Sequence, residues 1–371
     1  MNTVKSTIHN ELPQIAYEGT KNGAATITES SEIDELVQEY IKSVILASII
    51  PPHVEWEKVS KHQIHSRTAE NYIFLLKKHF LQQFSGSLIY SINTWELQNH
   101  FFCLAQRYSN SLLIKVHFLL YRMYRRAHIK WGIENPLNSD DFRLPASMKK
   151  DRKIEPYNDE EMLKLLSGVE NHPILKPIIN LTFATGCRIQ EILNLRWKHI
   201  DLDSGCLRIE RALTLHVAFD GDGNTLSRQT VDGRTKRRSS ERTLYIDDYT
   251  VKLIEEWRAY AALYTRTEFD PGGHIFGNRQ NSCYTYGGFR AVLNRHLVLQ
   301  YGKGHNLAAL HRIRHTVATR AAEEGASTIE LMQLLGDNQE RSVLRYTGKS
   351  QAIAKNNRDR ISRSMVSIRS S

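Results

Sequence analysis

Three short segments of this 371-residue chain carry side chains whose types and spacing suit the binding and transfer of a phosphate group. In the first, a turn containing Gly186 places Arg188 at the start of a helix, and Glu191 follows three residues later on the same face. A guanidinium can bind two phosphate oxygens at once, and a carboxylate can orient it. A structural Arg–Glu pair gives the same pattern, so both interpretations stay open for this segment alone.

The second segment places a histidine and another arginine on one helical face. His311 and Arg314 are three positions apart, and His315 follows directly as a supporting residue. An imidazole that donates or accepts a proton, beside a second guanidinium, suits phosphoryl transfer. A basic amphipathic helix is the alternative for this segment taken alone.

The third segment leads to a tyrosine. Leu335-Gly336-Asp337 is followed by Tyr346, nine positions after Asp337. A phenolic oxygen can act as a nucleophile and form a covalent intermediate. A single tyrosine is more often a packing residue, so the functional interpretation of Tyr346 depends on the two segments before it.

In kind, order and spacing, the three segments resemble the tyrosine recombinase (phage integrase) family. Its catalytic domain has an arginine in a T-G-x-R-x-x-E turn, a lysine in a β-hairpin, an H-x-x-R pair, an L-G-H segment and a tyrosine nine residues later. The resemblance covers residues 156–350 and extends more loosely into the helical half before them. It implies that Arg188, His311 and Arg314 bind the scissile phosphate and that Tyr346 is the nucleophile.

The hairpin lysine of the family is assigned here to Lys236. Residues 235–246 resemble the K-T-x-x-S-x-R-x-V-P-L hairpin, and Lys236 lies seven positions before Thr243, where the second strand begins. Arg237 and Arg238 are close rivals, but the pKa of an arginine is too high for proton donation at neutral pH. An exposed basic hairpin that touches backbone phosphate stays open as an alternative.

One position departs from the family. Asp337 stands where the family has a His or Trp that supports the phosphate. An ionised carboxylate beside a phosphate would repel it. The sequence therefore predicts that Asp337 points away, toward an arginine, or that Asn338 supplies a donor, and that the cost is a slower rate rather than a loss of activity.

The resemblance implies a reaction without a metal, a nucleotide or another cofactor. Tyr346 attacks the phosphorus and forms a 3′-phosphotyrosyl adduct, Lys236 protonates the leaving 5′ oxygen, and His311 assists removal of the phenolic proton. The adduct keeps the energy of the broken bond, so rejoining to another 5′ hydroxyl needs no ATP. The cysteines and histidines show no metal-binding spacing, which agrees with this prediction.

The elements that must position these residues are mostly helical. Apolar residues recur at helical spacing over 33–45, 68–80, 95–108, 109–131, 175–184, 189–195, 251–264, 289–300, 311–324 and 329–335. Strand-like residues lie at 207–209 and 243–246, with a polar excursion at 220–233 between them. The predicted fold is mainly α with a small antiparallel β-sheet: a helical core-binding domain and an α+β catalytic domain.

Composition and local pattern predict the order of the domains. The predicted ranges are a flexible N-terminal arm at 1–30, a helical DNA-binding domain at 31–138, a basic linker at 139–155, the catalytic domain at 156–350 and a C-terminal tail at 351–371. The resemblance implies that the tail is exchanged between protomers, and a frayed basic tail is the open alternative.

The composition favours a polyanionic partner. Hydrophobic residues make up 41% of the chain, enough for a core, and the net charge is +10. No signal peptide is visible, and the apolar runs are shorter than the roughly 20 residues that span a bilayer, so nucleic acid remains. Candidate DNA contacts are the basic residues of the 109–131 helix, the linker and the hairpin: Lys115, Arg122, Arg126, Lys149, Lys150, Lys153, Arg237 and Arg238. For the linker, a solvated hinge is equally open.

The partner expected from the resemblance is double-stranded DNA at specific sites, bound by a homotetramer on paired sites, with accessory DNA-bending proteins. A prokaryotic cytoplasm, at the nucleoid, is the expected location. Two other functions stay open. One is a type IB topoisomerase-like or telomere-resolving enzyme, and the other is a catalytically impaired DNA-binding accessory protein, which the Asp337 departure suggests.

Overall fold

The structure, a computed structural model, describes residues 27–28, 31–50, 63–149, 155–234, 241–265, 269–278 and 282–347. They form two compact units, unit 1 within 1–40 and 74–149 and unit 2 within 41–73 and 150–371. Several predicted features lie outside the described residues: nearly all of the N-terminal arm, Lys150, Lys153, Lys236, Arg237, Arg238 and the C-terminal tail. The domain boundaries predicted from the sequence stay a prediction.

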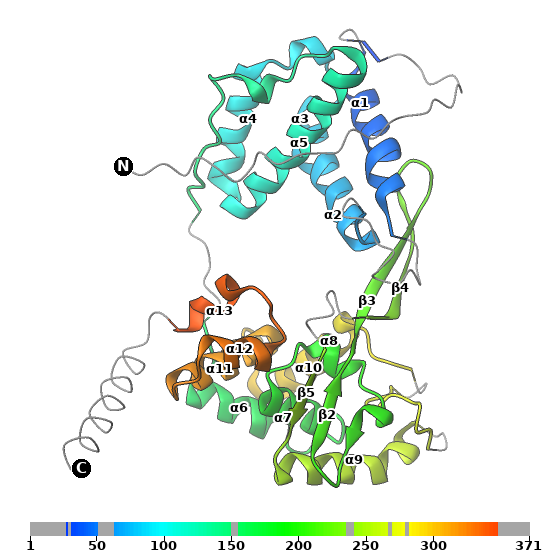
Figure 1. The fold of residues 1–371 in the computed structure, drawn as a ribbon, viewed down its shortest axis with the longest axis vertical. Helices are drawn as coiled ribbons and strands as arrows, with labels where there is room; N and C mark the ends of the chain where they lie inside the picture. Colours follow the sequence, from blue (N-terminus) through cyan, green and yellow to red (C-terminus); the bar gives the residue numbers. More distant parts are fainter. Residues whose placement is uncertain are drawn as a thin grey trace, which may run out of the picture. The chain divides into compact units, whose positions relative to one another are not determined.

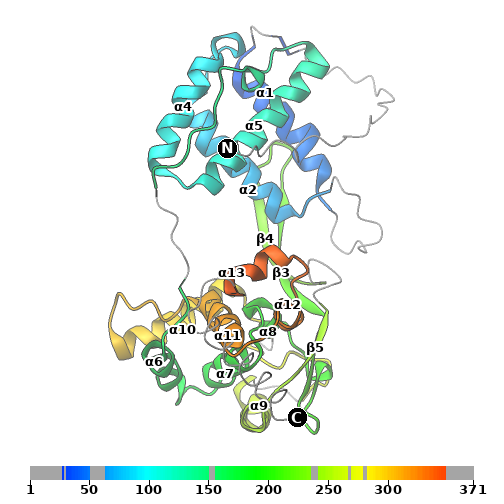
Figure 2. The same cartoon turned by 60° about the vertical axis from the view of Figure 1, so that its left-hand side comes forward.

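Unit 1 is helical in its described residues (Figures 1 and 2). Asn93 caps the start of the helix Thr94–Arg107, because its side chain accepts a hydrogen bond from Glu96 N at 3.0 Å. Gly132, with φ 74°, ends the helix Asn110–Trp131. The elements before residue 139 are α1 (Ile33–Tyr40), a π-helical turn (Ile41–Ile45), a 3-10 turn (Leu46–Ser48), α2 (Ser66–Leu76), a π-helical turn (Lys77–Leu81), α3 (Gln82–Phe84), a 3-10 turn (Ile89–Ser91), α4 (Thr94–Arg107), α5 (Asn110–Trp131) and a 3-10 turn (Pro136–Asn138). The turns at 41–48 and the part of α2 before Phe74 belong to unit 2.

The apolar stripe predicted for the 109–131 segment faces the core of unit 1. Val116 and Leu120 of α5 are buried, whereas Lys115 is exposed and Arg122 and Arg126 are partly exposed. Burial of such a stripe supplies most of the stability of a helix of this kind. The opposite, basic side of α5 is therefore available to solvent within this unit.

Unit 2 holds the segments singled out by the sequence. A capping box begins the helix Asp159–Val169: Asn158 Oδ1 accepts from Glu161 N at 2.8 Å, and Glu161 Oε2 accepts from Asn158 N at 3.1 Å. The helices are α6 (Asp159–Val169), α7 (Leu175–Thr185), α8 (Ile189–Leu193), a 3-10 turn (Trp197–His199), α9 (Asp248–Thr265), α10 (Tyr286–Tyr301), α11 (Leu310–Glu323), α12 (Thr328–Leu335) and α13 (Glu340–Thr347). Figures 1 and 2 show α12 and α13 lying against α11.

A small antiparallel sheet completes the main body of unit 2. Its strand order is β1 (Ile200–Asp201), β2 (Cys206–Ile209) and β5 (Arg242–Tyr245). Leu207 pairs with Ile200 on one side and with Leu244 on the other, and its side chain is fully buried. The predicted fold, mainly α with a small antiparallel sheet, is confirmed.

A long hairpin replaces the polar excursion expected at 220–233. β3 (Arg211–Phe219) pairs with β4 (Thr225–Arg234), and Asp220 closes the turn by accepting hydrogen bonds from Asp222 N and Asn224 N. Residues 225–229 of β4 are exposed and residues 230–233 are partly buried, and the strand lacks the apolar alternation by which a strand is recognised. The hairpin also contacts the segment 41–73, because Val217 N donates to Ser66 Oγ at 2.9 Å.

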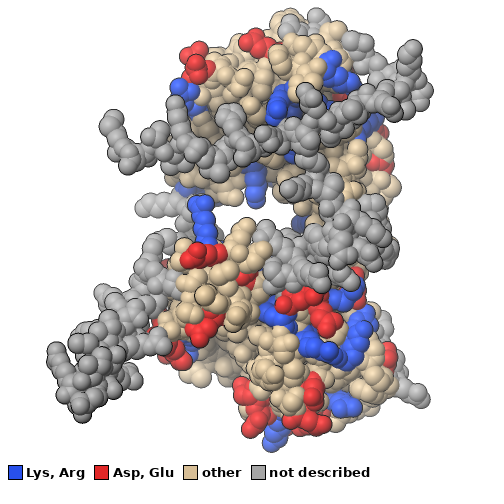
Figure 3. Space-filling model, viewed as in Figure 1, with Lys and Arg blue, Asp and Glu red and all other residues tan. Residues whose placement is uncertain are grey.

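Two global features bear on the partner. In the part of the chain that the structure describes, no helix is long and apolar enough to cross a membrane. Figure 3 shows Lys and Arg interspersed with Asp and Glu on the viewed face of each unit. On that face, the net charge of +10 is therefore not gathered into a field of one sign.

Candidate active site in unit 2

Arg188 lies at the junction of α7 and α8. Gly186 ends α7 in the left-handed conformation, with φ 62°, and a Cβ there would meet Val317 Cγ1 at 3.0 Å. The turn brings Arg188 to the N-cap of α8, where its backbone N donates to Glu191 Oε2 at 2.9 Å and its Nη1 donates to Oε1 at 3.1 Å. Glu191 thus orients the guanidinium, as the sequence suggests.

Glu191 also holds a second arginine that the sequence did not single out. Arg242, the first residue of β5, donates to Glu191 Oε2 at 2.9 Å, to Leu334 O at 3.0 Å and to Cys187 Sγ at 3.1 Å. Burial alone would raise the pKa of the Glu191 carboxyl, but the charges of Arg242 and Arg188 outweigh it and hold that pKa below its usual value. The available signal was the S-x-R of the hairpin motif, which ends in Arg242.

Arg314 reaches the same place from α11. Its side chain is 5% exposed, and it donates to Gly186 O at 3.1 Å and to Leu335 O at 2.6 Å. Burial, together with the charge of nearby Arg188, lowers the pKa of the Arg314 guanidinium to about 10. The group is still charged at neutral pH, so two positively charged guanidinium groups lie in one site.

Asp337 faces both arginines. Gly336 ends α12 with φ 60°, and Asp337 N donates to Met332 O at 3.0 Å. The Asp337 carboxylate places Oδ1 3.6 Å from Arg188 Nη2 and Oδ2 3.6 Å from Arg314 Nη2. The prediction that Asp337 points away from the phosphate position is therefore wrong: its carboxylate does face arginines, but these are the two that are expected to bind the phosphate.

Tyr346 belongs to the short helix α13, which packs on α11 and α12. Its ring lies against a small apolar cluster that includes the buried Leu331 and Val343. Its hydroxyl lies 3.2 Å from His315 Nδ1, and the two ring centroids are 5.4 Å apart. Burial raises the pKa of the phenol, so Tyr346 is protonated at neutral pH.

The two histidines of α11 differ in what they contact. His315 is buried against Tyr346, whereas the exposed His311 stacks edge-on against His315 with centroids 4.9 Å apart. Burial and the neighbouring His311 lower the pKa of His315 to about 4, so its imidazole is neutral at pH 7. Among the described residues the partner of the Tyr346 hydroxyl is therefore His315, and no contact supports the expected assistance by His311.

The remaining predicted residues are spread over the chain. Lys115, Arg122 and Arg126 lie on α5, and Lys149 is exposed at the end of unit 1. The candidate acid Lys236 falls between β4 and β5, outside the described residues, as do Arg237 and Arg238. Their roles stay predictions.

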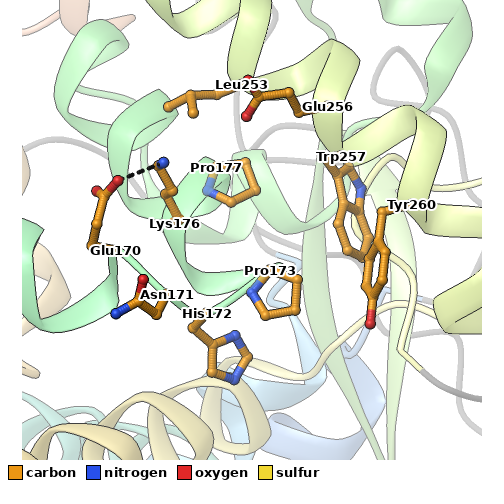
Figure 4. Close-up of a pocket in the computed structure, with 10 residues that line it drawn as sticks. All are labelled: Glu170, Asn171, His172, Pro173, Lys176, Pro177, Leu253, Glu256, Trp257 and Tyr260. Atoms are coloured by element: carbon orange, nitrogen blue, oxygen red, sulfur yellow. Dashed lines mark hydrogen bonds and ion pairs between the residues drawn. The ribbon is translucent and has the colours of Figure 1, made fainter.

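A surface pocket of about 260 Å³ lies elsewhere in unit 2, between the α6–α7 connection and α9 (Figure 4). Lys176 and Glu170 form an ion pair of 2.6 Å at its edge, and the indole of Trp257 donates to Ile275 O at 2.6 Å. None of the candidate site residues lines it. Within the described ranges, no group of three or more His, Cys, Asp or Glu side chains is placed to hold a metal ion.

A mainly helical unit with a small antiparallel sheet, which brings two arginines, a histidine pair and a tyrosine together in this chain order, has the arrangement of a tyrosine recombinase catalytic domain. Residues 157–352 match the model of the phage integrase family, which is more than half of the chain. The protein therefore belongs to the phage integrase family, the tyrosine recombinases.

Individual relatives are distant in sequence. A XerC-like tyrosine recombinase of Caldanaerobacter subterraneus subsp. tengcongensis is 26% identical over 332 residues, 86% of this chain and 79% of the relative. The integrase of Mycobacterium phage L5 is 24% identical over 229 residues, 61% of this chain and 57% of the relative.

Two solved structures share the fold. The Tn1549 transposon integrase, in complex with transposon right end DNA, gives a TM-score of 0.63 at 16% identity, over 90% of this chain and 100% of that chain. A lambda integrase tetramer bound to a Holliday junction gives a TM-score of 0.56 at 17% identity, over 86% of this chain and 79% of that chain.

The buried pair of Glu191 and Arg242 yields a stability prediction. Arg242→Met leaves Glu191 without its buried partner, so the free energy of unfolding should fall by about 3 kcal/mol. Arg208→Met, on the exposed side of β2, should change it by less than about 0.5 kcal/mol. Chemical denaturation followed by circular dichroism measures both, and equal losses in the two variants would contradict the assignment. Adding Glu191→Gln to Arg242→Met should recover part of the loss.

Proposed function

We propose that this protein is a site-specific DNA recombinase that cleaves and rejoins strands through a 3′-phosphotyrosyl adduct on Tyr346. The observation that carries the proposal is the convergence in unit 2 of the charged Arg188 and Arg314 with Tyr346, whose hydroxyl contacts a neutral imidazole. Together they supply a binding place for a phosphate, a nucleophile and a proton acceptor. Membership of the phage integrase family supports the same function.

In the proposed first step, Arg188, Arg314 and His311 bind the non-bridging oxygens of the scissile phosphate and stabilise the charge of the five-coordinate transition state. The Tyr346 oxygen forms a bond to phosphorus while the bond to the 5′ oxygen breaks. The phenolic proton leaves Tyr346, and Lys236 gives a proton to the 5′ oxygen. The phosphotyrosyl bond conserves the energy of the broken bond, so a second 5′ hydroxyl can reverse the step on a new strand.

His315 receives the phenolic proton in this proposal. Its Nδ1 lies 3.2 Å from the Tyr346 hydroxyl, within reach for direct transfer. Its pKa of about 4 in the free protein means that the imidazole is neutral at pH 7, and the negative charge of a bound phosphate would raise that pKa and make it a stronger base. His315 thus takes the role that the sequence gave to His311, and His311 keeps a phosphate-binding role.

The partner proposed is double-stranded DNA carrying specific sites. The exposed basic side of α5 and Lys149 supply backbone contacts from unit 1, and the linker and hairpin lysines and arginines add to them. The proposed assembly is a homotetramer on paired sites, in which protomers exchange their C-terminal tails and accessory proteins bend the DNA.

The lambda integrase, a structural relative, was solved as a tetramer bound to a Holliday junction, which supports the proposed assembly. Integration or excision of a mobile element in a prokaryotic cytoplasm is the proposed role.

A second function has one observation in its favour. The Asp337 carboxylate lies between the two arginines that would bind phosphate, as expected of an impaired site in a DNA-binding accessory protein. A type IB topoisomerase-like enzyme would share the chemistry but relax a supercoiled plasmid that lacks any specific site. Adduct formation and site dependence separate the three functions.

Tyr346→Phe should abolish covalent capture of DNA. The substrates are nicked duplexes tiled across the DNA that adjoins the encoding gene. A nick just downstream of the cleaved bond lets the short fragment with the freed 5′ hydroxyl dissociate, so rejoining is prevented and the adduct accumulates. The readout is a protein–DNA band that survives denaturing electrophoresis. Tyr245→Phe, at an exposed tyrosine of β5, should leave the band intact. DNA binding without any adduct from the wild-type protein would favour the accessory function instead.

The assignment of Lys236 is tested by the leaving group. A 5′-bridging phosphorothioate needs no proton to leave, so it should restore cleavage to Lys236→Ala to within about tenfold of the wild type. Cleavage of the ordinary phosphate by the same variant should be at least about a hundredfold slower. If the sulfur substrate rescues Arg237→Ala and not Lys236→Ala, the assigned register of the hairpin is wrong.

The two histidines of α11 can be separated by pH. His315→Asn keeps a hydrogen-bond acceptor near the position of Nδ1 but removes the base, so adduct formation should fall about a hundredfold at neutral pH. Its rate should then climb with pH as Tyr346 itself ionises, while the wild-type rate levels off. His311→Asn should lower the rate without this added pH dependence. The reverse pattern would return the proton-accepting role to His311.

A further inference from the structure

The position of Asp337 has a geometric meaning beyond its departure from the family pattern. Each of its carboxylate oxygens faces a different arginine, Oδ1 toward Arg188 and Oδ2 toward Arg314, at the same separation of 3.6 Å. A phosphodiester bound by the same arginines would also present two non-bridging oxygens, one to each guanidinium. The carboxylate therefore has the sign and the two-pronged shape of the group that the arginines are proposed to bind.

The two arginines are fixed by other contacts. Arg188 is oriented by Glu191, and Arg314 donates to two backbone carbonyl oxygens at 3.1 and 2.6 Å. Neither guanidinium needs Asp337 to keep its place. Glu191 offsets part of the charge of both arginines, and Asp337 is a further carboxylate that faces the two guanidinium groups where their positive charges meet in a partly buried site.

We propose that the Asp337 carboxylate is an internal stand-in for the scissile phosphate, which neutralises Arg188 and Arg314 in the DNA-free protein and is displaced when DNA binds. The inference rests on the proposed function for the identity of the displacing group. It makes Asp337 a positioning residue and not a catalytic one.

The contacts of Asp337 fit a group that is held and then released. Both separations exceed hydrogen-bond range, so charge rather than directed hydrogen bonding holds the carboxylate. The side chain is 30% exposed, so solvent is within its reach. Its backbone is fixed by the Asp337 N to Met332 O hydrogen bond, and rotation of the side chain alone can empty the position. A phosphate can form direct hydrogen bonds to both guanidinium groups, so it binds them more strongly than the Asp337 carboxylate does.

The first test needs no DNA. Asp337→Asn keeps the shape and removes the charge, so the protein should bind inorganic phosphate about tenfold more tightly, because the competing like charge is gone. Without phosphate, the same variant should melt at a lower temperature than the wild type, because the arginines lose their counter-ion. Thermal melting against phosphate concentration measures both effects. Asp337→Ala repeats the test should the amide variant fold poorly.

Two control variants identify the cause. Glu340→Gln removes one exposed negative charge three residues along the chain and should leave phosphate affinity unchanged within about twofold. In an Arg188→Gln background, Asp337→Asn should bring no gain, because the bridged pair no longer exists. The proposal would be rejected if Glu340→Gln raised the phosphate affinity as much as Asp337→Asn does. It would also be rejected if Asp337→Asn still raised the affinity in the Arg188→Gln background.

The second test measures adduct formation on the nicked duplexes at subsaturating DNA, where Asp337→Asn should be about tenfold faster than the wild type and Glu340→Gln should not. A slower Asp337→Asn protein with weaker phosphate binding would show that Asp337 assists the phosphate, and the stand-in would be rejected. If phosphate affinity rises as expected but no variant forms an adduct, the stand-in holds and the proposed recombinase function fails. The two ideas are therefore judged separately.

Discussion

The site depends on keeping three guanidinium groups close together in a largely buried place. Arg188, Arg242 and Arg314 repel one another, and burial makes that repulsion stronger than it would be in water. The structure offsets it with one fully buried carboxylate, Glu191, which pairs with both Arg188 and Arg242. It also offsets it with backbone carbonyls at the C-terminal ends of α7 and α12, which accept from Arg314 and Arg242. Those carbonyls lack helical partners and carry the negative end of the helix dipole.

This arrangement explains why both helices end in glycine. Gly186 and Gly336 adopt left-handed φ values of 62° and 60°, which close the helices abruptly and leave their last carbonyls free to face the arginines. The same two turns bring Arg188 and Asp337, which are far apart in the sequence, together in the site. Helix termination and the proposed phosphate binding thus depend on the same structural feature, since the turn that ends each helix also delivers a charged side chain.

The sequence predicted the parts of the site that are local and failed for the parts that are tertiary. Arg188 with Glu191 is a contact within one helical turn, so spacing alone indicated it. Arg242 meets Glu191 from another strand, and no periodicity places a strand residue against a helix start. His311 and His315 were equivalent by type, and only the packing of α13 on α11 shows which one faces Tyr346.

In the fold, the sequence predicted the helices that have apolar stripes. It did not predict the strand β4, because neither face of that strand is consistently apolar.

Tyr346, the proposed nucleophile, is held by less packing than the arginines that are proposed to bind the phosphate. The arginines are tied to Glu191 and to helix ends of the main core, whereas α13 is eight residues long and packs on a small separate cluster around Val343 and Leu331. Elements with little buried apolar surface are the first to open locally. The proposed phosphate-binding site is therefore preorganised, and Tyr346 lies on the part of the site that can shift at the least cost in packing. This division suits the proposed reaction, which attaches DNA to Tyr346 and then releases it, because Tyr346 can move without disturbing the arginines that are proposed to stabilise the phosphate.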